Sequence, residues 1–219
     1  LLISNSIKDN KNILFEGAQG TLLDIDHGTY PFVTSSNTSA GNASIGSGVG
    51  PLNFEKVVGV TKAYISRVGT GPFMTEQSNE IGDYLIEKGA EFGTVTGRRR
   101  RCGWLDLVSL KYSARINSLS ELFITKLDVL TGLEEINVCV GYKFKEQELT
   151  DYPLIDNVLE ESTPIYKKFK GWGEDISSVT EFSKLPESAQ IYITFIEEFT
   201  QIPIKYISVG PERKQNIIR

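Results

Sequence analysis

The chain has 219 residues, of which 40% are hydrophobic and 23% are charged, and this is the composition of an ordinary globular protein. Its formal net charge of -5 argues against a general nucleic-acid binder, which usually carries an excess of basic residues. No apolar stretch approaches the length of a membrane span, and no signal-peptide pattern opens the sequence. Cys102 and Cys139 fit no metal-binding spacing, so we expect two reduced thiols in a cytoplasmic protein.

The first part of the chain combines apolar runs with a long polar segment. Residues 12–15 predict a buried strand that enters the loop 16–20. Residues 34–51 are almost entirely Ser, Thr, Asn, Ala and Gly, which is compatible with a disordered linker or with a packed loop beside a ligand. Apolar residues then recur at helical spacing and predict a helix that contains Phe54, Val57, Val58, Thr61, Tyr64 and Ile65.

The second part alternates between helical and strand patterns. Helices are predicted at 80–88, where Gly89 marks the end, after Trp104, and at 186–199. Strands are predicted at 122–125, around 138–142 and at 204–207, whereas the polar stretch 145–173 predicts loop and a short hairpin. This alternation indicates an α/β fold with a mainly parallel sheet flanked by helices.

Three of the predicted strands end in loops that are rich in polar residues or glycine. These loops are 16–20, 126–128 and 208–210. Because open α/β sheets bind ligands just beyond the carboxyl ends of their strands, these loops are the first candidates for a site.

The loop after residue 125 carries a candidate for recognition of guanine. The Asp128 carboxylate can accept two parallel hydrogen bonds from the N1–H and 2-amino groups of guanine, and adenine offers no such pair of donors. The stem of Lys126 can lie over the base or ribose, and Ser208 and Gly210 can supply a hydroxyl and a close backbone approach. A Lys-Leu-Asp sequence on a solvated surface and a simple turn at 208–210 remain the alternatives.

Four adjacent arginines, Arg98 to Arg101, follow the Gly/Thr loop 93–97. Neighbouring guanidinium groups repel one another unless an anion or carboxylates neutralise them, and each can bind a carboxylate or phosphate as a bidentate fork. The position of the run between a glycine-containing loop and an apolar helix favours an anion site over a solvated charge run or a localisation signal.

Other polar residues allow two interpretations each. The amide of Gln19 can donate and accept together, which suits a lactam-type base edge, although it also suits a loop amide in water. The hydroxyls and amide of 34–37 can bind a phosphate or cap a loop. His27, the one histidine, is expected to be structural rather than catalytic.

Taken together, these segments resemble the adenylosuccinate synthetase family in order along nearly the whole chain. The residues that carry the resemblance are Leu14–Pro31, Val33–Asn37, Gly46–Gly48, Tyr64, Arg67–Gly69, Gly71–Phe73, Glu91–Gly93, Thr96–Arg101, Gly103–Asp106, Thr125–Leu130, Pro164–Tyr166, Gly171–Trp172 and Ser208–Pro211. The first ten residues and the stretch 145–161 carry little of it. The resemblance implies a fold similar to that of P-loop NTPases, of which residues 1–219 would form the C-terminal part.

The resemblance also implies ligands for particular positions. Contacts with IMP are expected at Gln19, Thr34, Val68 and Arg98. A loop that closes on L-aspartate is expected to comprise Thr94, Val95, Thr96, Gly97, Arg98, Arg99 and Arg100. Contacts with GTP are expected at Arg100, Lys126, Leu127, Asp128, Ser208, Val209 and Gly210.

The implied activity is a ligase reaction of AMP biosynthesis, in which GTP phosphorylates the 6-oxygen of IMP and the aspartate amine then displaces phosphate. The family's phosphate loop, catalytic Asp and His, and Mg²⁺ ligands have no counterpart in this sequence. Because the chain also opens at Leu1 and its one methionine is Met74, we expect a longer, cytoplasmic, homodimeric enzyme of which this chain alone is inactive.

Two other classes of function remain open from the sequence. A non-catalytic guanine-nucleotide-binding module would use Lys126, Leu127 and Asp128 and leave Gln19 without a role. A protein that binds RNA or a partner through the arginine run is opposed by the acidic balance of the chain.

Overall fold

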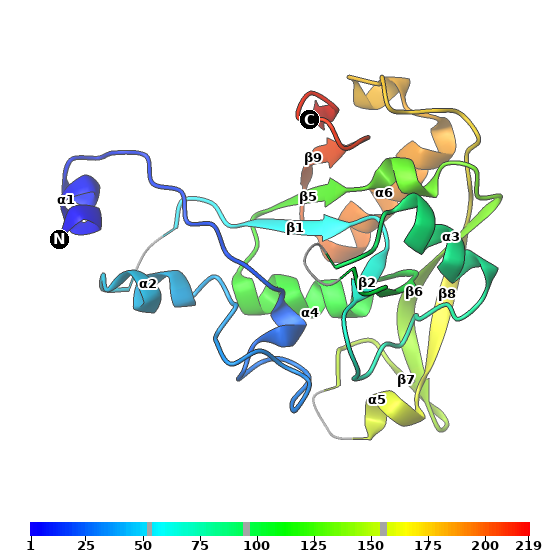
Figure 1. Ribbon diagram of the computed structural model, residues 1–219, viewed down its shortest axis with the longest axis horizontal. Helices are drawn as coiled ribbons and strands as arrows, with labels where there is room; N and C mark the ends of the chain where they lie inside the picture. Colours follow the sequence, from blue (N-terminus) through cyan, green and yellow to red (C-terminus); the bar gives the residue numbers. More distant parts are fainter. Residues whose placement is uncertain (52–53, 94–96, 154–156) are drawn as a thin grey trace.

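The computed structural model describes residues 1–51, 54–93, 97–153 and 157–219, which form an α/β architecture (Figure 1). One sheet holds β1 (Val58–Lys62), β5 (Glu121–Thr125), β9 (Ile204–Ser208) and β10 (Asn216–Ile218), in that order. The first three strands run parallel, and β10 pairs antiparallel with β9. The predictions of an α/β fold and of strands at 122–125 and 204–207 are therefore confirmed.

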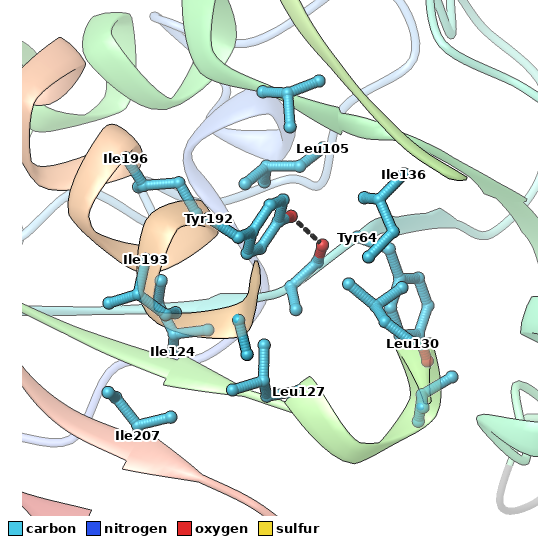
Figure 2. Packing of buried hydrophobic residues seen from close by; sticks show 14 of the residues in the cluster. Tyr64, Leu105, Ile124, Leu127, Leu130, Ile136, Tyr192, Ile193, Ile196 and Ile207 are labelled. Atoms are coloured by element: carbon cyan, nitrogen blue, oxygen red, sulfur yellow. Dashed lines mark hydrogen bonds between the residues drawn. The ribbon is translucent and has the colours of Figure 1, made fainter. Parts of the chain in front are cut away.

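The longest helix packs its apolar face on this sheet. In α6 (Glu187–Thr200), the fully buried Ile193 lies beside Ile124 of β5 (Figure 2). Ile196 of the same helix and Ile207 of β9 belong to the same buried core. Within the same core, the Tyr192 hydroxyl donates a hydrogen bond of 2.6 Å to the backbone oxygen that follows β1, that of Ala63 (dashed in Figure 2). An unpaired buried hydroxyl would cost about 1–3 kcal/mol, so this bond fixes the helix over the end of β1.

Two further helices begin at side chains that cap them. Asn79 accepts the backbone N–H groups of the first turn of α3 (Glu80–Lys88), and Asp106 does the same for α4 (Leu107–Asn117). Burial raises the pKa of the Asp106 carboxyl to about 6, although the hydrogen bond from Tyr142 and those from the helix lower it. Both helices were predicted, but Leu105, expected within the second, belongs to a strand.

A second sheet packs beside the first. Its strands are β4 (Leu105–Asp106), β6 (Glu135–Phe144), β7 (Gln147–Leu149) and β8 (Thr163–Lys170). β4 is parallel to β6, whereas β7 and β8 are antiparallel to it. The alternation around 138–142 predicted β6, and β7, within the stretch 145–173, pairs with it.

A two-stranded antiparallel ribbon joins the sheets to the expected ligand loops. It consists of β2 (Ile65–Arg67) and β3 (Arg101–Gly103), with Arg67 opposite Arg101. The smaller elements are α1 (Leu2–Lys8), η1 (Thr21–Leu23), α2 (Asn42–Ser47), η2 (Leu127–Leu130), α5 (Val158–Glu161) and η3 (Phe182–Lys184). Figure 1 shows α1 at one end of the molecule, away from both sheets.

Three predicted elements are wrong. Residues 12–15 form no strand, and Leu14 is 91% exposed, because no described strand lies beside this run to pair with it. The helix expected across 54–65 is instead β1 and β2, because pairing of β1 with β5 overrides a short helical pattern of β-branched residues. The stretch 145–173, expected to be loop and hairpin, contains the eight-residue β8, whose lysines conceal its strand pattern.

The long polar segment divides into two parts. Its beginning, around Thr38 and Ser39, is hydrogen-bonded to a buried carboxylate and so is a packed loop, whereas α2 beyond it has no buried residue. Cys102 and Cys139 are buried free thiols. Within the described ranges, no helix is long and apolar enough to cross a membrane.

Candidate functional site

The site begins where the parallel strands of the first sheet end. Because β5 and β9 are parallel neighbours, the loop at Lys126–Asp128 and the loop at Val209–Gly210 leave the same edge of the sheet side by side. Two of the three loops predicted to follow strands therefore lie at one edge of the sheet, whereas the loop 16–20 follows no strand. Such an edge is where α/β proteins of this kind hold their ligands.

In the first loop, the backbone turns sharply so that a carboxylate faces this edge. Lys126 adopts a left-handed conformation with φ 59°, and η2 starts directly after it. Burial raises the pKa of the half-buried Asp128 carboxyl above its usual value. Its own backbone N–H donates to this carboxylate, and within the described part of the chain no side chain does, so acceptor positions remain for a ligand with two donors.

The second loop is held closed by its own hydrogen bonds. The Ser208 hydroxyl donates to the backbone oxygen of Gly210 at 2.9 Å, and the Val209 N–H donates to the backbone oxygen of Gln215 at 2.9 Å. The side chain of Gln215 in turn donates to Ser177 at 3.0 Å. These bonds give the loop one defined shape beside Asp128.

A buried carboxylate, Glu91, connects the first loop to the arginine run. It is 0% exposed and accepts hydrogen bonds from Lys62 at 2.6 Å, Tyr64 at 2.5 Å and Arg100 at 2.9 Å. The ammonium group of Lys126 lies 3.5 Å from it. Burial raises the pKa of Glu91, but these partners outweigh burial and lower that pKa to about 2.

The four arginines have different environments. Arg101 is paired with Glu76 through two hydrogen bonds of 2.5 and 2.7 Å, and Arg99 is paired with the exposed Asp83. Arg98 is exposed, and its backbone oxygen accepts from the Gly93 N–H at 2.8 Å, which closes a hairpin.

Carboxylates therefore neutralise part of the arginine run, one of the outcomes expected of adjacent arginines. Gly97, at the tip of the hairpin, has φ 62°, a conformation that favours glycine. Thr94, Val95 and Thr96 lie outside the described residues.

A buried aspartate, Asp24, organises the segment that holds Gln19 and Thr34. Its carboxylate accepts the backbone N–H groups of Asp26, His27, Thr38 and Ser39 at 2.6–3.1 Å. Burial by itself raises the pKa of this carboxyl, but the four hydrogen bonds outweigh burial and hold that pKa at about 2. Figure 1 shows this segment below α1 and beside α4. Asn117 of α4 holds the segment through hydrogen bonds with Ala40 and Thr21.

The residues expected to bind the purine nucleotide come from the ribbon, the arginine run and the segment that contains Gln19 and Thr34. Val68 is 59% exposed and directly follows β2, at the same end of the ribbon as Arg100. Arg67 beside it donates to Thr29 at 3.0 Å and to the backbone oxygen of Phe32 at 3.2 Å, which ties the ribbon to the segment of Thr34. The exposed Gln19 has φ 63° and lies farther along that segment.

Two acidic residues that organise the site were missed as functional residues in the sequence. Glu91 and Asp24 lie within the segments that resemble the family, but their importance depends on contacts with residues up to 35 positions away. No group of three or more His, Cys, Asp or Glu residues in the described ranges could hold a metal ion. His27 contributes its backbone oxygen to the Tyr112 hydroxyl at 2.7 Å.

The fold and the site define a class of protein. Polar loops at the carboxyl edge of a parallel sheet, with a carboxylate open to a base and arginines close by, are typical of an α/β enzyme that binds nucleotides. The adenylosuccinate synthetase family profile matches residues 1–217. The chain belongs to the adenylosuccinate synthetase family, as the resemblance in the sequence indicated.

Individual relatives support this assignment. The chain is 52% identical over 219 residues to the adenylosuccinate synthetase of Halothermothrix orenii and 54% identical over 218 residues to that of Desulfatibacillum aliphaticivorans. In each case the match covers 100% of this chain and 51% of the relative, so the chain spans about half the length of the curated relatives it matches.

Solved structures agree. A fully ligated adenylosuccinate synthetase from Plasmodium falciparum matches with a TM-score of 0.96 and 49% identity, over 100% of this chain and 52% of that one. Succinoaminodeoxyadenylate synthetase of cyanophage S-2L, bound to dGMP and dATP, matches over 98% of this chain and 49% of that one, with a TM-score of 0.56. At 17% identity, this second likeness concerns the fold alone.

Replacing Asp24 with Asn should make the protein less sensitive to acid. The folded-state pKa of Asp24 is about 2, below the value near 4 of an unfolded chain, so its contribution to stability is complete above about pH 4 and is lost as the pH falls through about 2. The free energy of unfolding in urea, measured between pH 5 and 2.5, should depend less steeply on pH in Asp24→Asn. Asp26→Asn, which changes an exposed neighbour, is the control, and an unchanged slope in Asp24→Asn would contradict this account.

Proposed function

We propose that the protein containing this chain joins L-aspartate to IMP with hydrolysis of GTP, forming adenylosuccinate, GDP and phosphate. The observation that carries the proposal is the convergence of three loops. These are the guanine loop at Lys126–Asp128, the arginine hairpin that carries Arg98 to Arg100, and the end of the ribbon at Val68. The buried Glu91 links the first two, and the pairing of β2 with β3 links the hairpin to Val68.

The guanine base of GTP fits the edge formed by Asp128 and the loop of Ser208, Val209 and Gly210. A half-buried carboxylate without a donor among the described side chains suits the N1–H and 2-amino groups of guanine. The stem of Lys126, whose ammonium group is held by Gly89 and Glu91, lies beside this place. Leu127 is fully buried, so its contribution is to anchor the loop.

IMP and aspartate fit the neighbouring surfaces. We infer that Gln19 reads the base of IMP, that Thr34 binds its 5′-phosphate and that Val68 contacts its ribose. Arg98 and Arg100, on the hairpin with Gly97 and Arg99, would hold the carboxylates of aspartate. Arg98 would also reach the ribose, and Arg100 would also contact GTP.

The reaction proceeds in two balanced steps. The γ-phosphoryl group of GTP passes to the 6-oxygen of IMP, leaving GDP and 6-phosphoryl-IMP. The aspartate amine then attacks C6, and the 6-oxygen leaves as inorganic phosphate. The residues of this chain contribute binding, orientation and neutralisation of charge, which supply most of the help in phosphoryl transfer.

The residues described here do not fit the Mg²⁺ ion that the family uses. No group of acidic or other ligating side chains in the described ranges could hold it. We therefore assign no step through Mg²⁺ to this chain and expect its ligands, with the catalytic Asp and His, in the other half of the protein.

The direct test compares this chain with the protein at the full length of its relatives. Formation of adenylosuccinate from IMP, GTP and aspartate with Mg²⁺ should be found for the full-length protein and should be absent for residues 1–219 alone. The reason is that these residues contain no phosphate loop and no catalytic pair. Turnover by the 219-residue chain would overturn the division of roles, and no turnover by a folded full-length protein would overturn the proposed function.

Asp128→Asn in the full-length protein should weaken selectivity for GTP by about 1–3 kcal/mol, the cost of leaving buried donors unpaired. The measurement compares the KM for GTP with that for ITP, which lacks the 2-amino group. GTP should lose more, because ITP makes only one of the two hydrogen bonds. An equal loss for both nucleotides would be incompatible with bidentate recognition.

Arg98→Leu and Arg100→Leu should each raise the KM for aspartate by about one to two powers of ten, since a charge-assisted hydrogen bond contributes about 1.5–3 kcal/mol. Arg→Lys should restore only part of the loss, because an ammonium group lacks the planar fork. Varying each substrate in turn should show a larger effect on IMP for Arg98 than for Arg100.

Arg115→Leu provides the matched control for these two variants, because Arg115 lies on α4, outside the arginine run, and is paired with Asp151. If the Arg98 and Arg100 variants left the dependence on aspartate unchanged, the assignment of the hairpin to aspartate would be withdrawn.

A further inference from the structure

The buried carboxylate of Glu91 brings together side chains from three separate elements. Lys62 ends β1, Lys126 follows β5, and Arg100 precedes β3. Each of these cations is partly exposed, with 25–35% of its side chain accessible, whereas the carboxylate is completely buried. The cations therefore reach inward to Glu91 from the surface on which the ligand loops lie.

The balance of charge shows that this cluster is more than an isolated ion pair. Three cations surround one carboxylate, which leaves an excess of two positive charges at the site. Without Glu91 these cations would repel one another, because like charges a few ångströms apart in a partly buried place interact strongly. Burial is the main influence on Lys62 and lowers the pKa of its ammonium group, whereas the hydrogen bond and charge of Glu91 raise that pKa.

The two oxygens of Glu91 serve different loops. Oε2 accepts from Nη1 of Arg100 at 2.9 Å, whereas Oε1 accepts from Lys62 and Tyr64 and lies 3.5 Å from Lys126. Arg100 thus uses one nitrogen of its guanidinium group for Glu91. Its Nε is buried and has no hydrogen-bond partner in the part of the chain that the structure describes.

We propose that Glu91 is a positioning residue that holds Arg100 and Lys126 in their binding positions together, so that binding of aspartate and binding of GTP favour each other. This inference rests on the proposed function. Arg100 is hydrogen-bonded to this buried carboxylate and Lys126 forms an ion pair with it, so a shift of either cation changes the field that the other cation meets. A coupling between two ligands is reciprocal, so it can be measured from either side.

The test uses Glu91→Gln and Glu91→Asp in the full-length protein. Gln keeps the shape and removes the charge, so the KM for aspartate and for GTP should each rise about tenfold while kcat changes less than threefold. Asp keeps the charge but is one methylene shorter, so it should restore part of the loss. The affinity of a non-hydrolysable GTP analogue should improve about fivefold or more with aspartate in the wild type, and this improvement should disappear in Glu91→Gln.

Glu76→Gln is the matched control. It removes the charge from the neighbouring pair with Arg101, which touches neither Lys126 nor Arg100, so it should lower the melting temperature without changing the KM for aspartate or GTP.

The inference is overturned if Glu91→Gln lowers only the melting temperature, or if the wild type shows no coupling between aspartate and the GTP analogue. If Glu91→Gln does not fold, the same measurements on Glu91→Asp decide. Wild-type turnover is established first, so a failure of the proposed function is recognised separately from a failure of this inference.

Discussion

The arrangement of the site depends on one buried ion cluster. Glu91 lies at the meeting point of β1, β5 and the segment that leads into β3, and it is ionised because three hydrogen-bond donors and the ammonium group of Lys126 surround it. A buried carboxylate that lost these partners would be unfavourable by several kcal/mol, so the three elements are fixed in position relative to one another. The sheet determines where the strands end, and the cluster determines how the side chains beyond those ends are presented.

The amino-terminal part of the site also depends on a buried carboxylate, but different groups bind it. Asp24 is bound almost entirely by backbone N–H groups, whereas Glu91 is bound by charged side chains and a tyrosine hydroxyl. Backbone donors fix the path of the chain, so Asp24 shapes a loop that contains almost no regular structure. Charged side chains from three elements meet at Glu91, so this carboxylate joins parts that are far apart in the sequence. One acidic residue therefore shapes a loop, and the other joins separate elements of the fold.

The sequence predicted the strongly patterned parts of the fold and two polar loops that follow parallel strands. α3, α4 and α6 have capping residues or clear apolar faces, and β5 and β9 are apolar runs bounded by polar loops, so local chemistry specifies them. β1 and β8 were missed because their strand character comes from partners far along the chain. The same reason applies to the site. The loop of Lys126 could be recognised as a motif in the sequence, but Glu91, the carboxylate that pairs with Lys126, could not.

The outer side of β1 has a consequence for handling the chain. Among the described residues, no strand pairs with that side, and Val58 and Val60 are 41% and 70% exposed. Proteins commonly prevent other chains from pairing with such an edge by placing there a lysine that points into solvent. The side chain of Lys62 instead points inward to Glu91, so it cannot prevent this pairing. The ion cluster that organises the site thus leaves an unprotected, β-branched edge, which is a template for self-association. If this chain is expressed alone, it should be purified at low concentration to limit self-association. A charged substitution at Val60 should reduce that self-association.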